Sequence, residues 1–515
     1  MIAEKGTVIS GRADELDLGQ LRKAWQGHAR VALDEATLAR ISRSQQAVAT
    51  ALASHQPIYG INTGFGMLAN VRIPDGQLAE LQENLILSHC AGIGDFLEDR
   101  VVRLVLVLKI LSLAQGYSGI TPGVVLALAK LLNHEIYPCV PSRGSVGASG
   151  DLAPLAHLSA ILLGVGRARH AGREHEAAEA LRLAGLAPFT LQPKEGLALL
   201  NGTQVSTALA LGALFQVENV FAAACLAGAL SLDAARGSDT PFDARVSQVR
   251  GHQGQIDVAG LFRELMAGSR IRASHSDCER VQDPYSLRCQ PQVMGACLQS
   301  IRHVAEVLLA ESRAVTDNPL VFADEGVILS GGNFHAEPVA LACDYLATAI
   351  AEIGALSERR IALLVDARMS GLPPFLVEHS GLNSGFMVAQ VTAAALASEN
   401  KSLAHPASVD SLPTSANQED HVSMATTAAL RLYRMAENTA GVVAIELLAA
   451  AQGVEFHRPL ESSAPLEAVI AAVRGVSARF ERDRPLSGDI QAIQQLVLEG
   501  RFTAEARAIL PSWRD

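Results

Sequence analysis

The stretch GLALLNGTQVSTALALGALFQVENVFAAACLAGALSLDAA, residues 196–235, is dominated by alanine and leucine and contains no lysine or arginine. Alanine and leucine are strong helix formers. Their apolar side chains cover most faces of any helix formed here, which is typical of helices in the middle of a large bundle. We therefore predict long buried helices in this stretch.

Four later segments have the same character, at 291–314, 338–366, 387–403 and 424–452. The first 200 residues instead alternate helical segments with turns, for example at 59–66 and 144–150. We predict an all-α protein in two parts: a broken N-terminal helical region at 1–200, and a long-helix central bundle with a C-terminal helical tail at 201–515.

Composition excludes several classes of protein. The 515 residues are 49% hydrophobic and carry a net charge of −11 without a basic run, which argues against a nucleic-acid partner. Seven scattered cysteines and the lack of an apolar leader in residues 1–17 favour the cytoplasm. The longest wholly apolar run, 220–230, is too short to span a bilayer, so no membrane partner is expected.

A second stretch, GSVGASGDLAPLA at 144–156, is unusually poor in side chains. It lacks the glycine order of a dinucleotide loop and the Gly-Lys-Ser/Thr ending of a phosphate loop. Its G-A-S-G is one residue short of the hydrolase elbow G-x-S-x-G. The plain interpretation is a glycine-rich turn before a helix, with Ser149 or Asp151 as its cap and Pro154 in its first turn.

Other stretches of the sequence favour a more specific interpretation of residues 144–156. The sequence resembles the aromatic amino acid ammonia-lyase family from about residue 59 to 452, and the resemblance implies that family's all-α fold. It is carried by nine stretches in order: YGINTGFG (59–66), NLILSHCAGIG (84–94), GSVGASGDLAPLAHLS (144–159), EGLALLNGTQ (195–204), QDPYSLRCQPQVMGA (282–296), DNPLVF (317–322), SGGNFHAEPVA (330–340), NSGFMVAQVTAAALASENK (383–401) and SLPTSANQEDHVSM (411–424).

The resemblance implies that Ala148, Ser149 and Gly150 form a methylidene-imidazolone ring (MIO), with no cofactor bound and no metal. The Gly150 nitrogen attacks the Ala148 carbonyl, which cross-links these two residues, and modified Ser149 loses its hydroxyl. Each residue type suits this role: glycine lets the backbone fold back, alanine leaves the carbonyl uncrowded, and serine supplies a leaving hydroxyl. The resulting electrophile makes an amine a better leaving group.

The resemblance also implies roles for other residues. Tyr59 would remove the substrate's β-proton, and a phenol can do so near neutral pH only when donors or positive groups surround it. Arg288 would hold the substrate carboxylate with its planar fork. The remaining implied site residues either bind substrate or support the ring chemistry: Asn201, Gln282, Tyr285 and Phe334. Asp151 would assist cyclisation or cap a helix.

Two residues indicate the substrate. His89 and Glu419 map to the end of the pocket that holds the substrate's ring. A carboxylate suits an imidazole, which donates N–H to it, whereas a phenyl ring would leave that carboxylate buried and without a partner. We therefore expect L-histidine to be converted to trans-urocanate and ammonia, the first step of histidine degradation. The resemblance further implies a homotetramer with shared active sites.

Three alternative functions make different demands on the sequence. An aminomutase, or a lyase acting on another aromatic amino acid, would share the ring and most of the motifs. A helical scaffold without activity would lack the triplet or Tyr59, and both are present. A metal hydrolase would need an H-E-x-x-H helix or a tight Cys/His cluster, and the sequence has neither.

Overall fold

The computed structural model describes residues 6–53, 57–64, 66, 70–275 and 281–513. Its described part divides into two compact units, each built from separated stretches of chain. Unit 1 comprises residues 1–212, 306–343 and 406–430, and unit 2 comprises 213–305, 344–405 and 431–515. The division at residue 200 inferred from the sequence used a single boundary, whereas each unit here gathers three stretches.

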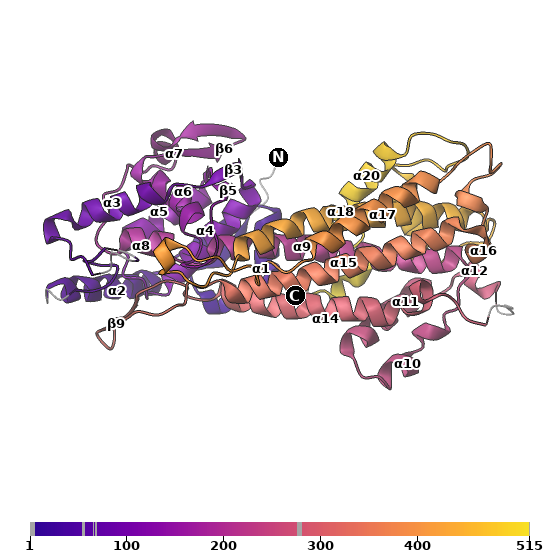
Figure 1. Cartoon of the computed structure of the whole chain (residues 1–515), viewed down its shortest axis with the longest axis horizontal. Coiled ribbons are helices and arrows are strands. Elements are labelled where there is room, and N and C mark those ends of the chain that lie inside the picture. The colour runs from indigo at the N-terminus through magenta and orange to yellow at the C-terminus, as the bar shows by residue number, and fades with distance from the viewer. Residues whose placement is uncertain (1–5, 54–56, 65, 67–69, 276–280, 514–515) are drawn as a thin grey trace. The chain divides into compact units, whose positions relative to one another are not determined.

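Within its described residues, unit 1 combines helices of 6 to 19 residues with four small sheets of two or three strands (Figure 1). Its helices are α1 (Leu18–Gln26), α2 (Glu35–Ala53), α3 (Leu78–His89), α4 (Asp99–Ala114), α5 (Pro122–Asn133), α6 (Leu152–Ala160), α7 (Ala177–Leu183) and α8 (Glu195–Leu200). Its strands are β1 (Thr7–Ser10), β2 (Ala29–Ala32), β3 (Ile93–Phe96), β4 (Tyr137–Pro138), β5 (Pro141–Arg143), β6 (Arg167–His170), β7 (Arg173–Glu176), β8 (Leu320–Phe322) and β9 (Val327–Leu329).

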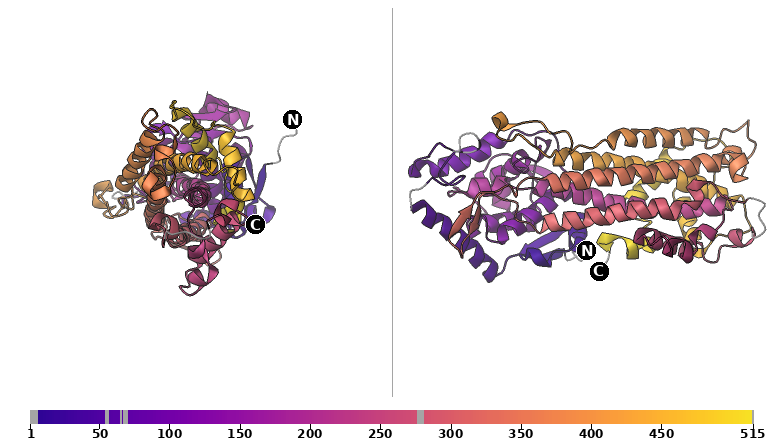
Figure 2. Two further views of the ribbon diagram at one scale, coloured as in Figure 1. Left: turned by 90° about the vertical axis from the view of Figure 1, so that its right-hand side faces the viewer. Right: turned by 60° about the horizontal axis from the view of Figure 1, so that its bottom comes forward.

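Four long helices cross the division between the units: α9 (Gln204–Ala234), α14 (Gln290–Ser312), α15 (Glu337–Val365) and α18 (Ala425–Glu455). In unit 2 their segments run side by side (Figure 2). The unit also contains α10 (Ala244–Gln248), α11 (Gln253–Met266), α12 (Arg270–Ala273), α13 (Tyr285–Arg288), α16 (Ala367–Ser370), α17 (Met387–Leu403), α19 (Ala464–Arg474) and α20 (Ser487–Leu498). The expectation of an all-α protein with long helices is confirmed.

The stretch at 196–235 forms the helices predicted from it, but as two pieces, α8 and α9. The break falls at Asn201, which is extended, and at Gly202, whose φ of +131° lies outside the helical region. Every described side chain of α9 is buried, which agrees with its apolar composition on all faces.

Among the described residues, three helices, α9, α14 and α15, are long and apolar enough to cross a bilayer by length and composition alone. The wholly apolar run at 220–230, from which no membrane span was predicted, is much shorter than α9. The most apolar 18-residue window of α9 is completely buried in the protein, compared with 44% of that in α14 and 61% of that in α15.

Candidate active site

The Ala148–Ser149–Gly150 triplet lies in the loop between β5 and α6, and its backbone is pressed against residue 202. Gly150 has a φ of +77° and pairs with Gly202 in an isolated β-bridge. A Cβ added to Gly150 would lie 2.6 Å from the nitrogen and 2.7 Å from the carbonyl carbon of Gly202. Only glycine fits this position, because both the dihedral angle and the space exclude a side chain.

Asp151 does not cap α6 through its side chain, so the capping role considered from the sequence is wrong. Its carboxylate is fully buried and accepts hydrogen bonds elsewhere. The donors are Ser145 Oγ at 2.8 Å, Thr426 Oγ1 at 2.8 Å, and the backbone nitrogen and Oγ of Ser206 at 2.7 and 2.9 Å. These bonds tie the start of α6 to the starts of α9 and α18. Ser149 does not cap the helix either.

Two side chains hold Ser149 directly. Asn201 donates from Nδ2 to the Ser149 carbonyl oxygen at 2.7 Å. The Ser149 hydroxyl donates to Glu419 Oε1, and Thr414 Oγ1 donates to the other carboxylate oxygen of Glu419 at 2.5 Å. Asn201 Oδ1 is buried and has no hydrogen-bond partner among the described residues. The amide oxygen is therefore a buried acceptor whose hydrogen-bonding capacity is unused among the described residues.

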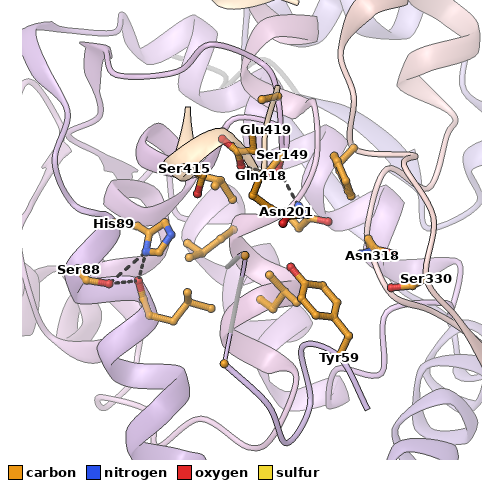
Figure 3. A pocket seen from close by; sticks show the side chains of 18 of the residues that line it. Tyr59, Ser88, His89, Ser149, Asn201, Asn318, Ser330, Ser415, Gln418 and Glu419 are labelled. Atoms are coloured by element: carbon orange, nitrogen blue, oxygen red, sulfur yellow. Dashed lines mark hydrogen bonds between the residues drawn. The ribbon is translucent and has the colours of Figure 1, made fainter. Parts of the chain in front are cut away.

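A cavity of about 910 Å³ opens in front of the triplet (Figure 3). All of its lining residues belong to unit 1. Seven of the residues singled out from the sequence line it: Tyr59, His89, Ala148, Ser149, Asn201, Phe334 and Glu419. The structure thus brings a phenol, an imidazole, an amide and a carboxylate, from four separated stretches of the sequence, to the cavity that the Ser149 side chain also lines.

His89 has a defined tautomer at the end of α3. Its Nδ1 lies 2.7 Å from the Leu85 carbonyl oxygen and 3.1 Å from Ser88 Oγ. A carbonyl oxygen only accepts hydrogen bonds, so Nδ1 carries a proton. In the neutral ring, Nε2 is then the acceptor. His89 can therefore accept a hydrogen bond at Nε2 while the helix holds its other nitrogen.

Five of the residues singled out from the sequence do not line this cavity, and two of them, Gly150 and Asp151, directly follow Ser149. Gln282, Tyr285 and Arg288 belong to unit 2, at or next to α13. The Tyr285 side chain is 71% exposed, and the Arg288 guanidinium lies 4.6 Å from its ring centroid. Arg288 Nε is buried without a partner among the described residues. Their roles stay predictions.

Two histidines that were not predicted as site residues, His335 and His421, also line the cavity. Their rings stack, with centroids 5.8 Å apart and planes 7° from parallel. His335 Nε2 also lies 3.1 Å from the His421 carbonyl oxygen. Both residues fall inside stretches already singled out, SGGNFHAEPVA and SLPTSANQEDHVSM, and that position is the signal that could have found them. Among the residues that the structure describes, no group of three or more His, Cys, Asp or Glu could hold a metal ion.

Comparison with known proteins places the chain in a class. The profile of the family described as aromatic amino acid lyase matches residues 16–475. The chain belongs to this family and is a carbon–nitrogen lyase, which confirms the interpretation of the nine sequence stretches.

Individual proteins of the family are similar to this chain over nearly its whole length. The histidine ammonia-lyase of Desulfotalea psychrophila is 61% identical over 506 residues, which cover 98% of this chain and 99% of that protein. The crystal structure of histidine ammonia-lyase from Trypanosoma cruzi matches with a TM-score of 0.88 and 39% identity, over 98% of this chain and 95% of that one. A tyrosine aminomutase from Streptomyces globisporus matches with a TM-score of 0.91 and 34% identity, over 96% and 98% of the two chains.

Proposed function

We propose that this protein is a histidine ammonia-lyase that converts L-histidine to trans-urocanate and ammonia, the first step of histidine degradation. The observation that carries the proposal is the Glu419 carboxylate, which contacts Ser149 inside the cavity. A substrate imidazole can donate N–H to this carboxylate, whereas a phenyl ring cannot. The identity to proteins named histidine ammonia-lyase supports the same substrate.

The residues around the triplet fit an MIO ring made from Ala148, Ser149 and Gly150. Gly150 has a positive φ and no Cβ, and both allow the backbone to bend back toward the Ala148 carbonyl. Asn201 donates to the Ser149 carbonyl oxygen, which remains a carbonyl in the ring. The ring would supply an electrophile that makes the substrate's amine a better leaving group.

The other residues would bind the substrate and move its proton. The Tyr59 side chain lines the cavity and would take the β-proton at its phenolate oxygen. Glu419 would hold the imidazole, and His89 would stand beside the ring through Nε2. Asn201 Oδ1, which is buried without a partner among the described residues, would accept a hydrogen bond from the substrate amine.

We propose a homotetramer in which copies share their active sites. Arg288, whose planar guanidinium suits a carboxylate, does not line the cavity in unit 1 of its own chain. Another copy could place Arg288, Tyr285 and Gln282 beside the cavity. Large apolar side chains exposed on α17, Val388 and Val391, offer surface for such contacts. We further propose a cytoplasmic location, with no nucleic-acid or membrane partner.

Two measurements test the proposed function. L-histidine should yield a product with the ultraviolet absorption of urocanate, which histidine lacks. The peptide that contains Ser149 should weigh two waters less than its sequence. An aminomutase, the alternative suggested by the tyrosine aminomutase neighbour, would yield β-histidine instead. A peptide of unaltered mass in an active preparation would overturn the ring, and no turnover of L-histidine by a protein with the ring would overturn the substrate.

A further inference from the structure

Lys109 is a fully buried lysine that the chemistry proposed above does not use. It lies on α4, and its side chain is 1% exposed. Its ammonium nitrogen donates to the carbonyl oxygen of Asn201 at 2.7 Å. Burying an ammonium group is unfavourable, and a methionine of similar length would avoid that cost. The stability of the core therefore does not account for a lysine at this position.

The carbonyl that Lys109 holds belongs to the peptide group between Asn201 and Gly202. The nitrogen of the same peptide group is the atom that would lie 2.6 Å from a Cβ on Gly150. The adjoining atoms also contact the triplet: Asn201 Nδ2 donates to the Ser149 carbonyl, and Asp151 N donates to the Gly202 carbonyl at 2.8 Å. A shift of this peptide group would therefore move the backbone at 149–151.

We propose that Lys109 is a positioning residue for formation of the ring: it holds the Asn201–Gly202 peptide group against Gly150, so that the Gly150 nitrogen stays bent toward the Ala148 carbonyl carbon. This inference rests on the proposed function, because it concerns the ring. Proximity of this kind lowers the barrier to a bond-forming step by fixing the reacting atoms before they react.

The step balances without Lys109 gaining or losing an atom. A bond forms between the Gly150 nitrogen and the Ala148 carbonyl carbon. The Ala148 oxygen leaves as water with the amide hydrogens of Ser149 and Gly150. The second water takes the Ser149 hydroxyl and the hydrogen on its Cα, which leaves a methylene group. Lys109 acts through the backbone of its neighbour and contacts none of the atoms that react.

The test follows ring formation directly, because the variant could also alter stability. The wild type, Lys109→Met and Lys109→Arg are made by cell-free translation, and the mass of the Ser149 peptide is followed over time in the folded fraction. The matched control is Lys194→Met, since Lys194 is also fully buried in unit 1 but pairs with Asp317 at 2.8 Å. A second control, Lys130→Met, removes an exposed lysine on α5.

We expect Lys109→Met to lose the two waters several-fold to about tenfold more slowly than the wild type, as the loss of one hydrogen bond implies. Lys109→Arg, which keeps a donor, should recover part of the rate, and the two controls should match the wild type. Folded Lys109→Met that forms the ring at the wild-type rate would overturn this inference alone. A wild-type chain that never loses the waters would overturn the proposed function instead.

Discussion

Replacing Gly150 by alanine tests the close approach of the triplet to residue 202. The variant is best made in a Ser149→Ala background, where no ring can form and the chain keeps its ordinary backbone. An alanine at a φ of +77° costs about 1–2 kcal/mol. Its Cβ would also meet backbone atoms of Gly202 at 2.6 and 2.7 Å, and overpacking of this kind costs about 1–3 kcal/mol. We expect a total loss of roughly 2–5 kcal/mol.

Gly172→Ala in the same background separates the two contributions. Gly172 has a φ of +75°, but a Cβ there meets nothing within 4 Å. It should therefore cost only the dihedral part, about 1–2 kcal/mol. Urea unfolding of both variants, followed by circular dichroism, gives the difference. Equal midpoints for the two variants would refute the contact between Gly150 and Gly202.

Three further predictions follow from the same geometry. Glu419→Gln should keep the fold and lower kcat/KM for L-histidine about ten- to hundredfold, as loss of a charge-assisted hydrogen bond implies; unchanged turnover in a protein with an unchanged melting curve would contradict the histidine assignment. Burial lowers the pKa of Lys109 from 10.5 to about 7, an effect that Lys194 adds to and that Asp317 and Asp151 oppose. Between these values the unfolded chain binds more protons, so the unfolding free energy should rise from pH 7 to pH 9 more in the wild type than in Lys109→Met. Analytical ultracentrifugation should show a tetramer, and a fully active monomer would rule out shared sites.

The long helices could be predicted from composition and length. The expected segments at 291–314, 338–366, 387–403 and 424–452 match α14, α15, α17 and α18 to within a few residues. The small sheets could not be predicted from the sequence. For example, β6 and β7 have the sequences RARH and REHE, which lack the apolar alternation that marks a half-buried strand. These strands pair across a turn at Ala171 and Gly172, so local backbone geometry defines them.

Only the site residues that lie inside recognisable sequence motifs could be predicted. The nine stretches contain most of the residues that line the cavity, but not Val71, Ile73 and Leu81. They gave no indication that Asp151 binds Ser206 and Thr426 rather than the start of its own helix. They also did not reveal Lys109, which lies outside all nine stretches. Both contacts join segments far apart in the chain, and hydrophobic periodicity carries no information on such pairs.

Because the groups that meet at Ser149 lie far apart in the sequence, the site can be completed only some time after the triplet has been synthesised. Glu419 follows Ser149 by 270 residues. At about 5–20 residues per second, a ribosome needs roughly 14–54 s to add that length. Throughout this interval the nascent chain contains the triplet while unit 1 still lacks its last stretch, residues 406–430. We therefore predict that the proposed ring closes only at the end of synthesis or later, and that a messenger truncated before codon 406 yields a chain whose triplet remains ordinary peptide.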